Sequence, residues 1–170
     1  MHHTHLRDNA APYGVVSPDE MLRLILNSRV YDVAQETPLE PAPRLTQRLQ
    51  NQVLLKREDL QPVFSYKLRG AYNRIAHIPQ TDRPRGVIAA SAGNHAQGVA
   101  YAARALQMHA LIVMPSTTPA IKVDAVRDLG AEVVLTGDTY ADAQTYCEKL
   151  VVSSGRTFVH PFDDLLVIAG

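Results

Sequence analysis

Residues 86–114 read GVIAASAGNHAQGVAYAARALQMHALIVM, and this stretch decides the fold class of the chain. The apolar run 86–90 predicts a short buried strand, and the turn-forming residues that begin at Ser91 lead into an Ala-rich helix over 95–106. A second apolar run, 110–114, predicts another strand. Two short strands separated by one helix favour parallel pairing through a right-handed crossover connection.

The same alternation continues toward the C-terminus. The expected elements are a helix over 118–130, a strand over 132–135, a helix over 139–152 and a strand over 157–159. Thr118-Pro119 is expected to cap and start the first of these helices, and Gly130 suits a left-handed residue at its end. Three strand–helix units in succession predict an α/β fold with a layered, parallel sheet.

The N-terminal third is less regular. The expected elements are a helix from Pro18 to about Asn27, extended chain over Val30–Leu45, a buried strand over Val53–Lys56 and a helix over Leu68–His77. Ser17 and Glu20 have the spacing of a capping box at the start of the first helix. At the other end, Asp163–Ile168 has the pattern of a helix or loop that is just beginning.

Composition excludes several classes of function. The 170 residues contain 17 Lys+Arg and 17 Asp+Glu, so no net charge attracts nucleic acid or an anionic membrane. The longest apolar runs are too short to cross a bilayer. The single cysteine, Cys147, excludes an internal disulfide and fits a reducing, cytoplasmic setting. His2, His3 and His5 could suggest metal binding, but a solvated tail is the favoured interpretation, and no metal site is expected.

Lys67 is the first candidate for chemistry, in the run Ser65-Tyr66-Lys67-Leu68-Arg69-Gly70 where a loop enters a helix. A lysine in such a place is ordinarily a solvated surface residue. A cation next to a helix N-terminus is electrostatically unfavourable, however, and this favours the neutral, nucleophilic amine. Tyr66 either packs in the core or stacks on a planar ring.

Two further segments lie where ligands bind in parallel sheets. Residues 91–98, SAGNHAQG, follow a strand and open a helix whose first free amides can hold an anion; the alternative is a well-capped turn with no ligand. The charged run Lys56-Arg57-Glu58-Asp59 ends another strand. It either forms a solvated turn or orients the nearby lysine loop.

Four motifs occur in one order along the chain: 56–59 (KRED), 65–72 (SYKLRGAY), 91–98 (SAGNHAQG) and 112–115 (IVMP). Together they resemble the serine/threonine dehydratases of the tryptophan-synthase-β-like (fold type II) enzymes that use pyridoxal 5′-phosphate (PLP). The likeness is greatest to the biosynthetic threonine dehydratases, which also match Thr37-Pro38-Leu39 and the run 121–127 (IKVDAVR). The resemblance extends from about Val30 to Gly170.

The resemblance implies a fold and a division of the chain. The fold is a three-layer open parallel sheet, incomplete in this chain. A mobile tail over 1–16 would precede an edge of the larger PLP subdomain over 17–68. The smaller α/β subdomain would span 69–158, and 159–170 would begin the return to the larger one. The family's Gly-rich phosphate loop would follow the position of Gly170, so residues 1–170 alone are expected to be inactive.

The resemblance also implies roles for individual residues. Lys67 would carry the cofactor as a Schiff base and act as the base on the substrate Cα proton. Tyr66 replaces the aromatic, usually Phe, that packs on the cofactor ring. Asn94 would donate a hydrogen bond to the 3′-oxygen of the cofactor. The substrate carboxylate would be held by Ser91 and by the backbone amides of Ala92, Gly93, Asn94 and His95.

The expected reaction is deamination of L-threonine to 2-oxobutanoate and ammonia, the first step of isoleucine biosynthesis. Serine racemases of this family carry a serine immediately before the glycine of the 91–98 loop, where this chain has Ala92. The substitution favours elimination over racemisation.

Two alternatives remain open: a truncated product without catalysis, and a dehydratase of L-serine or threo-3-hydroxyaspartate. The implied partners are the small amino-acid substrate and, at full length, further copies in a homo-oligomer.

Overall fold

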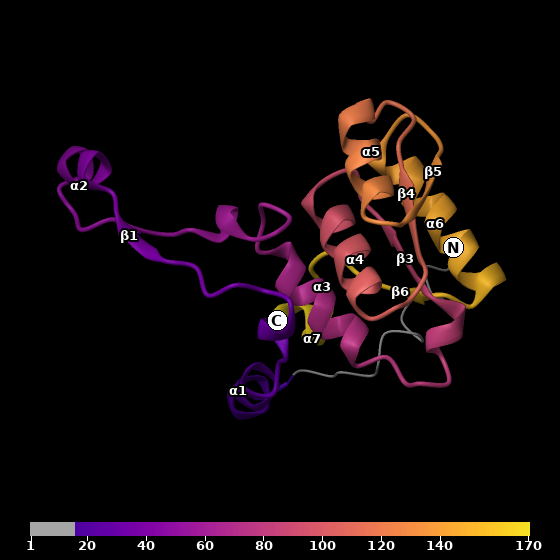
Figure 1. Cartoon of the computed structure of the whole chain (residues 1–170), viewed down its shortest axis with the longest axis horizontal. Helices are drawn as coiled ribbons and strands as arrows, with labels where there is room; N and C mark the ends of the chain where they lie inside the picture. Colours follow the sequence, from indigo (N-terminus) through magenta and orange to yellow (C-terminus); the bar gives the residue numbers. More distant parts are fainter. Residues whose placement is uncertain (1–15) are drawn as a thin grey trace.

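The computed structural model describes residues 16–170 and divides into a compact α/β body and a projecting arm. Figure 1 shows the arm, which carries β1 (Leu39–Pro41), α2 (Pro43–Leu49) and β2 (Leu54–Lys56), extending away from the body. The two arm strands pair antiparallel, with Glu40 opposite Leu55. The predictions for the N-terminal tail, including its three histidines, concern residues outside the described part of the chain.

The body is built on a four-stranded sheet in which all neighbours are parallel. The strand order is β5 (Glu132–Leu135), β4 (Ala110–Met114), β3 (Val87–Ala90) and β6 (Thr157–Phe158). The predicted parallel α/β fold is confirmed, and the bounds of β4 and β5 agree with the sequence prediction residue for residue.

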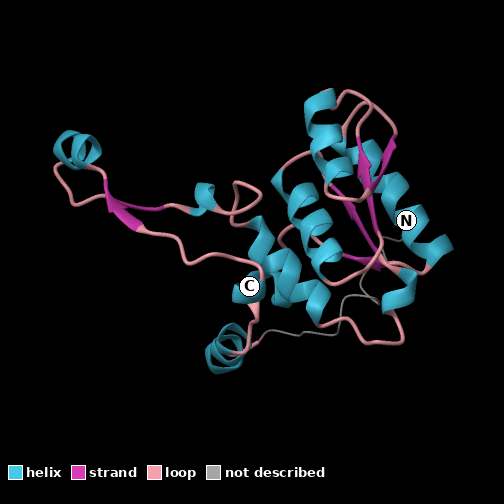
Figure 2. Cartoon of the chain, viewed as in Figure 1, coloured by secondary structure: helices cyan, strands magenta, loops and turns pink. Residues whose placement is uncertain are grey.

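Helices cover both faces of the sheet, giving three layers (Figure 2). The helices of the body are α3 (Lys67–Ala76), α4 (Asn94–Ala105), α5 (Ala120–Asp128) and α6 (Tyr140–Ser154). On β3, Val87 and Ala89 face a core shared with α3, α4 and α5, whereas Ile88 and Ala90 face α6. This alternation follows from the two-residue period of a strand, and burial on both faces explains why the strands are apolar throughout.

Three short 3₁₀ turns and two peripheral helices complete the described part of the chain, residues 16–170. The 3₁₀ turns are η1 (Val30–Asp32), η2 (Glu58–Leu60) and η3 (Arg83–Arg85), and the helices are α1 (Pro18–Leu26) and α7 (Leu165–Ala169). The capping box of Ser17 and Glu20 forms as predicted. α7 packs against α3 and α1, so the C-terminal segment lies beside the N-terminal one.

Three local predictions are wrong. The segment Val30–Leu45 is not uniformly extended, because it contains η1, β1 and the start of α2, where Pro43 occupies the first turn that tolerates proline. The strand near Val53–Lys56 is not buried: Leu54 and Leu55 are 44% and 45% exposed on the arm. Thr118 does not cap α5, whose N-cap is Pro119 without a side-chain hydrogen bond.

Candidate functional site

A close contact between two helices brings the lysine motif next to the 91–98 loop. Gly98 of α4 faces the first turn of α3, where a Cβ atom would lie 3.0 Å from the carbonyl carbon and oxygen of Lys67. Only a residue without a side chain allows the two backbones to approach so closely. Gly98, which belongs to the SAGNHAQG run, therefore helps to set the position of Lys67.

Lys67 is half-buried and directed into the protein, unlike a solvated surface lysine. It is the first residue of α3, and its backbone amide donates to Ser65 Oγ at 3.2 Å. Its Nζ donates to the carbonyl oxygen of Pro161 at 2.7 Å. The amine thus occupies a defined position at the start of a helix, held by a residue far away in the sequence.

A cavity of about 500 Å³ opens at this amine. It is lined by Tyr31, Lys56, Glu58, Tyr66, Lys67, Arg69, Gly70, Pro161, Phe162, Val167, Ile168 and Gly170. Tyr66 is 59% exposed, and its ring centroid lies 5.5 Å from Lys67 Nζ. The volume is in the range of small-molecule sites, and an aromatic ring beside an amine suits a planar ligand with a carbonyl group.

The loop from Ser91 to His95 opens α4 but does not line this cavity. Ser91 is buried, and its Oγ accepts a hydrogen bond from the amide of Gly93 at 3.3 Å. Ala92 and Gly93 are half-buried, whereas Asn94 is exposed. Within residues 16–170 the amides of Asn94 and His95 have no hydrogen-bond acceptor, so the helix start keeps donors for an anion.

The side chain of His95 has a structural contact that the sequence did not indicate. It is buried, and its Nε2 lies 2.9 Å from the carbonyl oxygen of Val159. A carbonyl only accepts, so Nε2 carries the proton. Burial lowers the pKa of His95 to about 4, so the ring is neutral at pH 7 and Nδ1 is a bare acceptor without a partner in the described residues. The side chain joins the start of α4 to the segment that follows β6.

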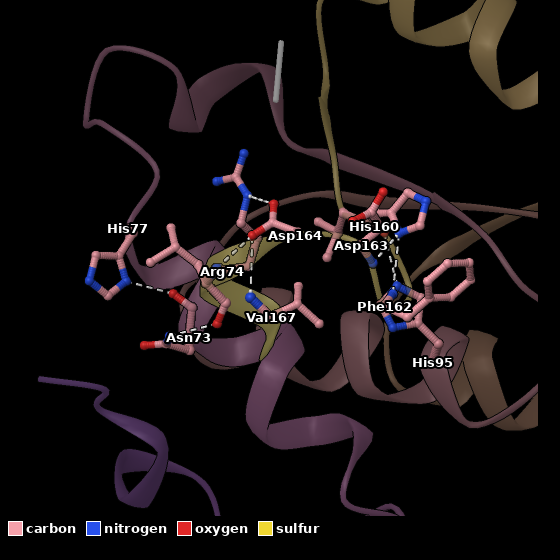
Figure 3. A network of polar contacts seen from close by, with 11 residues as sticks. Asn73, Arg74, His77, His95, His160, Phe162, Asp163, Asp164 and Val167 are labelled. Carbon is pink, nitrogen blue, oxygen red and sulfur yellow. Dashed lines mark hydrogen bonds and ion pairs between the residues drawn. The ribbon is translucent and has the colours of Figure 1, made fainter. Parts of the chain in front are cut away.

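That segment, residues 159–164, is the part of the site that sequence reasoning missed. Pro161 accepts from Lys67, and Phe162 lines the cavity. Figure 3 shows His160, Asp163 and Asp164 beside His95 and the residues of α3. The available signal was its place at the carboxyl end of a parallel strand, the edge of the sheet where ligands bind.

The charged run at Lys56–Asp59 combines ion pairs with side-chain hydrogen bonds, and its role in orienting the lysine loop stays a prediction. Arg57 forms partly exposed ion pairs with Glu40 and Asp59 at 2.6 and 2.8 Å. Glu58 instead accepts hydrogen bonds from Thr37 Oγ1 at 2.6 Å and from Gln61 Nε2 at 3.1 Å. These contacts tie η2 to the base of the arm, a few residues before the lysine loop.

Comparisons with known proteins agree on one family. The model described as "Pyridoxal-phosphate dependent enzyme" matches residues 30–170. A biosynthetic L-threonine dehydratase of Burkholderia multivorans is 59% identical over 154 residues, which are 89% of this chain and 30% of that protein. The biosynthetic, chloroplastic threonine dehydratase 1 of Solanum lycopersicum is 58% identical over 157 residues, which are 92% of this chain and 26% of that protein. The chain thus spans less than a third of the length of these relatives.

Solved structures give the same result. The processed form of threonine deaminase isoform 2 from Solanum lycopersicum has a TM-score of 0.86 and 52% identity, and the match covers 91% of this chain and 44% of that one. Serine racemase from Dictyostelium discoideum has a TM-score of 0.80 and 29% identity, over 88% of this chain and 49% of that one. Among residues 16–170 no helix is long and apolar enough to span a membrane.

Proposed function

Because the chain belongs to the family of pyridoxal-phosphate dependent enzymes, we propose that it supplies the cofactor-bearing lysine of an L-threonine dehydratase. The complete enzyme converts L-threonine to 2-oxobutanoate and ammonia, the first committed step toward isoleucine. The observation that carries this proposal is the amine of Lys67, half-buried at the mouth of a cavity of about 500 Å³. The biosynthetic threonine dehydratases at 58–59% identity support the substrate.

The residues present fit PLP. The cavity is large enough for the cofactor ring, and Lys67 and Tyr66 both line it. When bound, PLP supplies the electron sink that makes the substrate Cα proton acidic. Lys67 Nζ holds the cofactor and then accepts that proton. Asn94, which is exposed at the start of α4 and lies outside the lining of the cavity, would donate a hydrogen bond to the 3′-oxygen of bound PLP.

The start of α4 orients the substrate. Ser91 and the backbone amides of 92–95 bind its carboxylate, and the unpaired amides of Asn94 and His95 support this assignment. The side chain of His95 is turned to the carbonyl oxygen of Val159. Because burial lowers its pKa to about 4, the ring is neutral at pH 7 and adds no positive charge to the charge of Lys67. We assign the complete enzyme to a reducing, cytoplasmic-type compartment, with which the free, buried Cys147 is compatible. We also propose that the complete enzyme is a homo-oligomer.

Substitution of Lys67 tests the proposal. Lys67→Ala in the full-length enzyme removes the attachment point and the base together, so the visible absorbance of lysine-bound PLP and the release of 2-oxobutanoate should both disappear. Lys56→Ala, a second lysine at the same cavity, is the matched control and should retain the absorbance. A Lys67→Ala enzyme that kept both signals would refute the assignment.

Ala92 is proposed to keep the enzyme a dehydratase instead of a racemase. A methyl group has no proton to deliver to the second face of the substrate. Chiral chromatography of unreacted L-serine and L-threonine should show no D-serine and no Cα epimer of threonine. Rapid appearance of either would favour the racemase function named for the Dictyostelium relative. Comparing kcat/KM for threonine, serine and threo-3-hydroxyaspartate separates the substrate alternatives.

A further inference from the structure

The turn formed by residues 160–163 fixes the carbonyl group that holds the Lys67 amine. Pro161 lies inside this turn, and its carbonyl oxygen accepts the hydrogen bond from Nζ at 2.7 Å. The position of this oxygen depends on the conformation of its own segment, because a proline has no backbone N–H with which to anchor itself. What fixes the turn therefore also fixes the amine.

His160 closes the turn through its side chain. Its Nδ1 lies 3.2 Å from the amide nitrogen of Phe162 and 2.7 Å from that of Asp163. Both amides can only donate, so Nδ1 must be an unprotonated acceptor, and the proton of the neutral ring is on Nε2. The ring also packs edge-on against Phe158 and Phe162, with centroids 5.8 and 4.6 Å away. Figure 3 shows His160 beside Phe162 and Asp163 of its own turn, with dashed lines marking its contacts to the turn.

Both ends of the turn are anchored to other helices. Before it, the carbonyl oxygen of Val159 is bound by His95 of α4. After it, Asp164 caps α7 by accepting from the amides of Leu166 and Val167, and it pairs with Arg74 of α3 at 2.7 Å. That ion pair is largely shielded, with side chains 13% and 11% exposed. Between these fixed ends, the hydrogen bonds within the turn, in the described part of the chain, are the two that His160 Nδ1 accepts.

We propose that His160 is a positioning residue that holds the Pro161 carbonyl oxygen, and through it the free amine of Lys67, ready for attachment of PLP. The inference rests on the proposed function, because it concerns the lysine that takes up the cofactor. His160 does not touch the reacting atoms. It acts by keeping a neutral Nδ1 aimed at two amides.

This arrangement makes the turn sensitive to pH. Protonation of Nδ1 replaces the acceptor by a donor and sets it against two N–H groups. Burial lowers the pKa of His160, the carboxylates of Asp163 and Asp164 raise it, and the ammonium of Lys67 on α3 lowers it. His95 on α4 faces the same space and is neutral near pH 7. The turn is thus closed at neutral pH and opens as the pH falls below the usual range of a histidine.

Two substitutions separate the acceptor from the ring. In His160→Asn, Oδ1 occupies the place of Nδ1 in the side-chain skeleton, so the acceptor remains and cannot be protonated in this pH range. In His160→Phe, the ring and its packing remain and the acceptor is lost. His77→Phe is the matched control, since His77 also bonds a backbone group, Asn73 O, at the exposed far end of α3.

The measurement is the rate at which the full-length enzyme, stripped of cofactor, takes up added PLP, followed by the absorbance of the lysine-bound form. At pH 7.5 the Phe variant should be slower than wild type by about tenfold or more, since a misplacement of about 1 Å can cost up to about 100-fold. The Asn variant and the His77→Phe control should stay within about threefold of wild type. Equal rates for the Phe and Asn variants overturn the inference.

The pH dependence provides a second readout, which does not require the Phe variant to fold. The ratio of wild-type to Asn-variant rates cancels the pH effects that both proteins share. This ratio should fall as the pH is lowered from 8 to 5, and a constant ratio overturns the inference. If wild type takes up no PLP at Lys67, the proposed function fails instead.

Discussion

Gly98→Ala should weaken the packing of α3 on α4 and displace Lys67, although alanine is the better helix former. In an open helix the change would stabilise the protein by about 1 kcal/mol. Here the new Cβ would lie 3.0 Å from the carbonyl carbon and oxygen of Lys67 and 3.1 Å from the amide nitrogen of Leu68. The helices must separate by about 0.4 Å to reach ordinary contact, and overpacking of this kind costs about 1–3 kcal/mol. The steric cost equals or exceeds the gain, with a net loss of about 0–2 kcal/mol.

The substitution should slow PLP uptake at Lys67 more strongly than it lowers the stability of the fold. The neighbouring atoms are backbone and cannot rotate away, so the shift is transmitted to the start of α3 and to the hydrogen bond with Pro161. We expect a melting temperature lower by up to about 4 °C and PLP uptake slower by about tenfold in the full-length enzyme. Arg104→Ala, at an exposed position on the same helix, should change neither. A Gly98→Ala enzyme with a higher melting temperature and an unchanged rate of PLP uptake would refute the reasoning.

Three further predictions concern stability and the chain by itself. Because burial lowers the pKa of His95 to about 4, the unfolded chain binds more protons than the folded one between pH 6.5 and 4. The free energy of unfolding should therefore fall by about 3 kcal/mol as the pH drops through this window. In urea titrations, His95→Gln, which keeps a donor for Val159, should lack this loss. Asp164→Asn should destabilise the protein by about 3 kcal/mol, because Arg74 would keep a shielded charge without a partner; an unchanged urea midpoint would argue against it. Residues 1–170 expressed alone should release 2-oxobutanoate from threonine no faster than free PLP, because Leu54 and Leu55 are exposed and the start of α4 is proposed to bind the substrate carboxylate; sustained turnover would contradict this.

The body of the fold could be predicted from local sequence pattern, because a sheet that is buried on both faces has strands that are apolar at nearly every position. Strands such as β4 are short apolar runs bounded by turn residues, and α6 has a capping box at Thr139 and a left-handed glycine at Gly155. The arm could not be predicted in the same way. The prolines around α2 indicate extended chain, although one of them occupies the first turn of a helix. The apolar run in β2 indicates burial, but burial depends on what packs against the strand.

The sequence by itself determined that Lys67 lies beside an aromatic residue where a loop enters a helix, and that the 91–98 loop opens another helix after a strand. Only the tertiary structure decided what holds these parts together. The acceptor of the Lys67 amine lies 94 residues further along the chain, and His95 turns its side chain to Val159, 64 residues away. The physical reason is that a parallel sheet gathers the carboxyl ends of separate strands at one edge. Local periodicity encodes each strand and each cap, whereas contacts between these ends depend on strand order and on the close approach that Gly98 allows.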